Sequence, residues 1–228
     1  MMILSAGILG LSSCSDFLDQ NSPSEMNQTT VYNSTYYTSL RVNKLYGGMG
    51  QDRTYSQDWS ITTNINSDIE LVDGLGNGAY EAGNRGAGNY NVSTGWSTLT
   101  DEWTAMYGII EDANDIIEGI RQSPLFVEGN DSYQEMGRYL GEALTIRAMV
   151  YFDMLRYWGD IPMKLETSQP DLSNAFMAKT DRDVIMDTLM VDLEEATKLL
   201  PWAGENGYTT EHVTKGYAHA LLAQIAMT

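Results

Sequence analysis

The chain has 228 residues, of which 43% are hydrophobic, enough for one large domain or two small ones with a real core. Its 31 acidic residues outnumber the 13 Lys and Arg residues, which gives a formal net charge of −18. Such a surface repels phosphate backbones and anionic lipid headgroups, so nucleic acid is excluded as a partner and any membrane attachment should come from acyl chains. Fourteen Tyr and five Trp favour contact with a ligand that has flat apolar faces, such as a sugar.

The beginning of the chain has the layout of a bacterial lipoprotein signal. An apolar run over residues 3–11 is followed by two serines and Cys14, the only cysteine in the chain. We expect residues 1–13 to be a signal peptide, Cys14 to be lipidated, and the polar residues 14–33 to form a tether. The basic start of a secretory signal is missing. The alternative is a frayed N-terminal segment with Cys14 as a buried thiol.

A first helix is predicted over Tyr36–Leu45, ending at Gly47 and Gly48. The following residues, 50–98, are rich in Gly, Asn and Asp and show neither a helical period nor clear strands. We expect a long loop region there. Long ordered loops in compact domains are usually functional.

Residues 100–122 and 132–157 are predicted to form a pair of amphipathic helices. Apolar side chains recur at every third or fourth position in both segments, which is typical of one buried face. Thr100 is the expected cap of the first helix. Ser132 opens the second, with Glu135 at the spacing of a capping box.

A second pair is predicted over residues 181–200 and 212–228, after a connecting loop over 163–179. Helices in pairs are typical of a tetratricopeptide-like solenoid, although the regular repeat of about 34 residues is absent. The predicted fold class is therefore mainly α, with irregular TPR-like hairpins after a Gly-rich loop region. The last helix has no stop signal before Thr228, so we expect an N-terminal part of a longer protein.

The loop region contains the best candidates for a sugar site. Sugar recognition needs a flat aromatic ring for the C–H face and planar polar groups for pairs of hydroxyls. The candidates for ligand binding are Trp96, Tyr90, Asn91, Arg85 and Asp73. Trp59 is a weaker candidate. The alternative is that these side chains only satisfy the turns of their own loop.

Other prominent residues have structural explanations. Trp103, Tyr107 and Tyr151 lie at helical spacing and are expected in the core. Arg147 lies within an apolar face, so we expect a buried ion pair or bonds to carbonyl groups. Pairs such as Glu111 and Asp112 are expected on a solvated helix surface.

Enzymatic functions receive little support. The glycines do not form a phosphate-binding loop or a dinucleotide fingerprint. His212 and His219 lie seven residues apart, on one predicted helix, without the acidic pattern of a zinc site. We therefore predict no catalytic residue, no metal and no cofactor. A glycosidase needs two carboxylates that face a cleft, and most carboxylates here are expected on helix faces.

Five segments in the same order resemble the SusD/RagB family of outer-membrane nutrient-binding lipoproteins. They are Ser13–Asp19, Trp103–Ile117, Gly141–Pro162, Asp192–Pro201 and Thr214–Ala223. The resemblance covers most of the chain from Cys14 to Thr228, with residues 34–228 as the N-terminal region of the family. We therefore expect the chain to lack the C-terminal half of the family.

The resemblance implies a cell-surface lipoprotein of the outer membrane that captures an oligosaccharide without catalysis. It also implies a partner, a SusC-like TonB-dependent barrel that takes up the glycan. The alternative function is a TPR-type scaffold that binds another protein in the groove of its helices.

Overall fold

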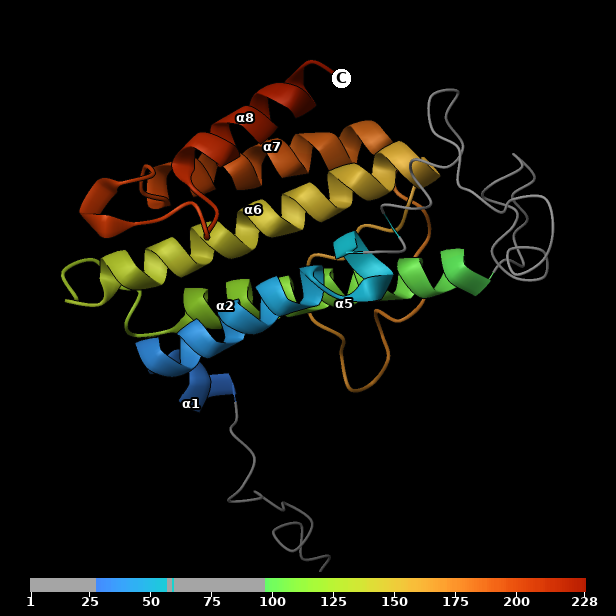
Figure 1. Cartoon of the computed structure of the whole chain (residues 1–228). Helices are drawn as coiled ribbons and strands as arrows, with labels where there is room; N and C mark the ends of the chain where they lie inside the picture. Colours follow the sequence, from blue (N-terminus) through green and yellow to red (C-terminus); the bar gives the residue numbers. More distant parts are fainter. Residues whose placement is uncertain (1–27, 57–58, 60–96) are drawn as a thin grey trace, which may run out of the picture.

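The computed structural model describes residues 28–56, 59 and 97–228 (Figure 1). This part of the chain is mainly helical, as predicted, with one isolated antiparallel bridge between Ile161 and Thr180. The principal elements are α1 (Gln28–Tyr32), α2 (Thr35–Met49), the short π-helical turn η2 (Asp52–Ser56), α5 (Ser97–Gln122), α6 (Tyr133–Trp158), α7 (Arg182–Leu199), the 3-10 turn η3 (Glu205–Gly207) and α8 (Lys215–Ala226).

Helix α6 forms the centre of the fold. It packs against α2 and α5 on one side and against α7 on the other, and α8 covers α7 (Figure 1). Nearly every residue of α6 from Met136 to Leu155 is buried, because apolar neighbours surround it. The predicted helical hairpins, α5 with α6 and α7 with α8, are both present.

The folded part begins earlier than the sequence predicted. Helix α1 falls within the expected tether, residues 14–33, yet it buries Val31 and Tyr32. The Tyr32 hydroxyl donates to Asp115 Oδ2 at 2.7 Å. The Tyr32 ring lies against Gly119 of α5, where an added Cβ would come within 2.0 Å of it. Aromatic packing on a glycine therefore holds α1 to the bundle.

The ends of the helices follow the sequence predictions only in part. Asp181 and Thr214 accept hydrogen bonds from backbone N–H groups of the helices that they precede. Ser132 precedes α6 but its side chain makes no capping bond. Helix α5 already begins at Ser97, so Thr100 is not its cap. Helix α2 continues through Gly47 and Gly48 to Met49, because that turn packs on Ile109 of α5.

Arg147 is the buried ion-pair residue that the sequence predicted. Its Nε and Nη2 donate to Asp192 Oδ2 of α7 at 3.0 and 2.7 Å. Its Nη1 donates to Asn114 Oδ1 of α5 at 2.8 Å. All three side chains are buried, so the guanidinium links three helices inside the core.

A second buried carboxylate, Glu142 of α6, links α6 to α2 and to the segment before α8. It accepts from the Tyr46 hydroxyl of α2 at 2.7 Å and from Arg138 at 3.0 Å. His212 Nδ1 lies 3.0 Å from the same carboxylate. The sequence prediction that His212 and His219 share one helix is wrong. Helix α8 begins at Lys215, so it contains His219 but not His212.

Some sequence predictions lie outside the described residues. These include the signal peptide 1–13 and the lipidation site Cys14. In the part of the chain that the structure describes, no helix combines the length and the apolar character needed to cross a membrane.

The Arg147–Asp192 pair generates a prediction about stability. In the Asp192→Leu variant the Arg147 guanidinium stays buried without its counter-charge, which should lower the free energy of unfolding by about 3–5 kcal/mol. Urea denaturation followed by circular dichroism measures the loss. The control is Glu195→Gln, because Glu195 forms an exposed ion pair with Arg121 at 2.6 Å and should contribute less than about 1 kcal/mol. Equal losses in the two variants would contradict the assignment.

Candidate functional site

The site begins where α6 ends. Gly159 has a φ of 74° and its N–H bonds to the carbonyl of Leu155, so the helix stops at a glycine. The buried Ile161 pairs with Thr180 in the isolated bridge. The bridge brings the two ends of segment 162–179 together. The segment between them forms a loop that lies against α5.

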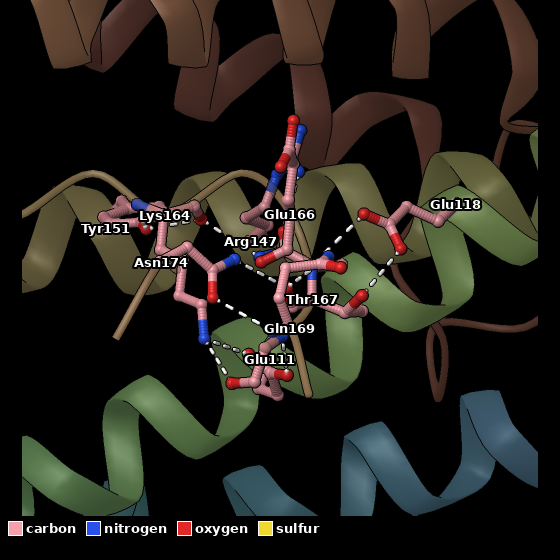
Figure 2. A network of polar contacts seen from close by, with 11 residues as sticks. Glu111, Glu118, Arg147, Tyr151, Lys164, Glu166, Thr167, Gln169 and Asn174 are labelled. Atoms are coloured by element: carbon pink, nitrogen blue, oxygen red, sulfur yellow. Dashed lines mark hydrogen bonds and ion pairs between the residues drawn. The ribbon is translucent and has the colours of Figure 1, made fainter. Parts of the chain in front are cut away.

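Hydrogen bonds from the helices hold the backbone of this loop (Figure 2). Asn114 Nδ2 donates to the carbonyls of Lys164 and Glu166 at 3.0 and 3.3 Å. The Tyr151 hydroxyl donates to the carbonyl of Lys164 at 2.8 Å and accepts its N–H at 2.7 Å. Burial raises the pKa of Tyr151 to about 12, so this phenol stays protonated and keeps both bonds. The loop is thereby fixed to two buried helices.

Two glutamates of α5 complete the attachment. Glu118 accepts from the backbone N–H and the hydroxyl of Thr167 at 3.1 and 2.9 Å. Glu111 accepts from Lys164 Nζ at 2.8 Å and from the N–H of Ser168 at 2.6 Å (Figure 2). Partial burial raises the pKa of Glu111, but the bonds from Lys164 and Ser168 outweigh it and lower that pKa below its ordinary value. Glu111 therefore binds the loop rather than lying on a freely solvated surface.

Between the loop and α5 lies an open pocket of about 740 Å³, here called the aromatic pocket. The α5 side contributes Trp103, Tyr107, Gly108 and Glu111, and the loop side contributes Pro162, Lys164, Ser168 and residues 174–178. The Trp103 and Tyr107 rings lie 5.0 Å apart between centroids. Phe176 lines the loop side and is 94% exposed. The pocket thus combines uncovered ring surface with charged and hydroxyl groups.

A continuous series of aromatic rings supports the α5 side of the pocket. Trp158 at the end of α6 meets Trp103 edge to face, with 5.4 Å between centroids. Trp59 packs on Trp158 at 5.7 Å and on Tyr157 at 5.2 Å. Such contacts fix the orientation of large side chains, because aromatic pairs prefer particular geometries. Trp59, the weaker sequence candidate, therefore supports Trp158 and does not line the aromatic pocket.

The five ligand-binding candidates from the sequence lie outside the described residues. They are Asp73, Arg85, Tyr90, Asn91 and Trp96.

Two residues that the sequence assigned to the core belong to the pocket. Tyr151 is fully buried, as predicted, but Trp103 and Tyr107 are only partly covered and line the pocket. Phe176 and Lys164 were missed altogether. A phenylalanine in the mostly polar segment 166–176 was the available signal for the first of them.

The chemistry available in the pocket suits a neutral, polyhydroxylated ligand. Ring faces can cover the C–H face of a sugar, while a carboxylate, an ammonium and a hydroxyl can bond to its hydroxyls. Across residues 28–56 and 97–228 no three His, Cys, Asp or Glu side chains are grouped so as to hold a metal ion.

Comparison with known proteins agrees with this chemistry. Residues 16–227 match the SusD-like family described as "Starch-binding associating with outer membrane". SusD-like protein P25 of Formosa agariphila is 28% identical over 195 residues, which cover 81% of this chain and 34% of the relative. The chain therefore spans about a third of the length of that curated relative.

Solved structures show the same fold. A SusD homologue from Bacteroides thetaiotaomicron superposes with a TM-score of 0.73 at 24% identity, over 87% of this chain and 37% of the homologue. A protein described as a laminarin-binding SusD-like protein gives a TM-score of 0.68 at 20% identity, over 86% of this chain and 40% of its own. The resemblance seen in the sequence is thus confirmed, and the chain belongs to the SusD-like family.

Proposed function

We propose that this chain is the N-terminal part of a surface lipoprotein that captures an oligosaccharide and delivers it, without catalysis, to a SusC-like TonB-dependent transporter. The observation that carries the proposal is the aromatic pocket, where exposed ring surface adjoins Glu111 and Lys164. The family description and the laminarin-binding relative support a glycan as the ligand.

Attachment and delivery are the parts of the proposal that come from the sequence and the family resemblance. Cys14 is the proposed lipidation site, and it places the protein on the outer membrane at the cell surface. Asp73, Arg85, Tyr90, Asn91 and Trp96 are the proposed further ligand-binding residues. A glycan binder of this kind needs no catalytic group, so purified protein should release no reducing sugar.

Phe176 tests the aromatic pocket directly. The Phe176→Ala variant removes a ring that is almost fully exposed, so it should leave the fold intact while it weakens glycan binding by about five- to tenfold. Isothermal titration with a glycan identified on an array measures the change. Leu172→Ala is the matched control, because Leu172 is a large exposed residue of the same loop outside the pocket. Unchanged affinity in Phe176→Ala would count against the pocket.

Trp96→Ala separates glycan capture from a protein-binding scaffold. If Trp96 stacks on the sugar, the variant should lose oligosaccharide binding by at least about tenfold and keep its binding to the transporter. Affinity is measured by titration, and transporter binding by co-purification. Full glycan affinity together with loss of the partner would favour the TPR-type scaffold instead.

Glu111 makes glycan binding sensitive to acid. Its pKa is lower in the folded protein than in the unfolded chain, so its stabilisation of the loop is complete above the ordinary value of about 4.3. That stabilisation is lost as the pH falls through the lower folded value. Glycan affinity should therefore begin to fall once the pH drops below the ordinary carboxyl value. In Glu111→Gln affinity should be weaker at neutral pH and depend less on pH, and an unchanged pH profile would contradict this role.

A further inference from the structure

A second pocket, of about 660 Å³, lies beside the aromatic pocket and shares helix α5 with it. It is formed by the end of α2, by η2 and by α5, and is here called the α2 pocket. Its lining includes Lys44, Gln51, Arg53 and Asp112. These ammonium, amide, guanidinium and carboxylate groups bond well to pairs of hydroxyls. Among the residues that the structure describes, no aromatic ring lines this pocket.

The two pockets meet on α5. Gly108 and Glu111 line both of them. These residues are three positions apart, so they form one strip along the helix surface. Trp103 and Tyr107 lie toward the aromatic pocket, whereas Ile109 and Asp112 lie toward the α2 pocket. The barrier between the pockets is therefore this strip.

Gly108 has no side chain, so no side chain rises from the strip between the pockets at this position. Close packing does not explain why a glycine is present there. A Cβ at Gly119 would meet the Tyr32 ring at 2.0 Å, and one at Gly141 would meet Leu200 at 2.8 Å, so close packing requires both of those glycines. A Cβ at Gly108 would meet nothing within 4 Å. A glycine in a helix interior costs about 1 kcal/mol relative to alanine. Gly108 lines both pockets, so the open space above it adjoins each of them.

We infer that the ligand is an extended glycan chain that crosses α5 at Gly108, with one end stacked in the aromatic pocket and further units bonded in the α2 pocket. This inference rests on the proposed function and adds to it a preference for longer oligosaccharides. A mono- or disaccharide fills only the aromatic pocket. Each added unit gains contacts until the chain reaches the lining at Lys44 and Gln51.

The Gly108→Leu variant tests the crossing. The experiment uses the whole protein and size ladders, from disaccharide to heptasaccharide, of starch-derived and laminarin-derived glucans and of any further glycan that an array identifies. Wild-type affinity should rise with chain length. Gly108→Leu should weaken binding of the longest member by about tenfold and leave the shortest nearly unchanged.

Gly47→Leu is the matched control. Gly47 is also a glycine in a helix with no atom within 4 Å of an added Cβ, and it lines neither pocket. Leucine is a better helix former than glycine, so both variants should be at least as stable to heat as the wild type. Gly47→Leu should keep the wild-type dependence on chain length.

The failures can be told apart. If the protein binds no glycan on the array, the proposed function fails and this inference fails with it. If glycans bind with an affinity independent of length, the capture function stands and the crossing is wrong. The crossing is also wrong if Gly108→Leu keeps the wild-type length dependence, or if it weakens short and long glycans equally.

Discussion

The buried guanidinium of Arg147 sets the constraint on which both the bundle and the pocket depend. A charge removed from water must find partners for its donors, and Arg147 finds them on two other helices, at Asp192 and Asn114. Asn114 in turn donates through its Nδ2 to the carbonyls of Lys164 and Glu166. One chain of hydrogen bonds therefore runs from α7, through the core, to the loop that lines the aromatic pocket. The placement of the loop therefore depends on the packing of the helices.

This arrangement explains how an irregular loop can serve as a binding wall. Loop backbone groups at the protein surface usually bond to water, and their conformation is then poorly fixed. Here Tyr151, Glu118 and Glu111 bond to the backbone of residues 164–168. Binding loses less conformational entropy when the receptor is already ordered. Asn174 Nδ2 donates to the carbonyl of Thr167 at 2.7 Å, so the part of the loop that carries the exposed Phe176 is bonded to this fixed segment.

The helices were predictable from the sequence because their apolar residues have a clear period. The buried role of Arg147 followed from a charge inside an apolar face. The pocket was not predictable in the same way. The period shows that Trp103 and Tyr107 face inward, but not how far other atoms cover them. That depends on the loop over 163–179, whose path is set by side-chain bonds from distant residues. Helix α1 was missed because its sequence is mostly polar and its burial depends on contacts with distant residues, the Tyr32 ring with Gly119 and the Tyr32 hydroxyl with Asp115.

The glycines of α5 show how structure separates two roles that look the same in a sequence. Gly108 and Gly119 are both interior helix positions and both lower helix propensity equally. Only the surroundings distinguish them, because the Tyr32 ring occupies the space beside Gly119 and nothing occupies the space beside Gly108. A glycine that close packing requires, such as Gly119, stabilises the bundle. A glycine in open space where two pockets meet, such as Gly108, lowers helix stability and allows no closer packing in exchange. Such a position is expected where close approach of a ligand to the backbone matters more than stability.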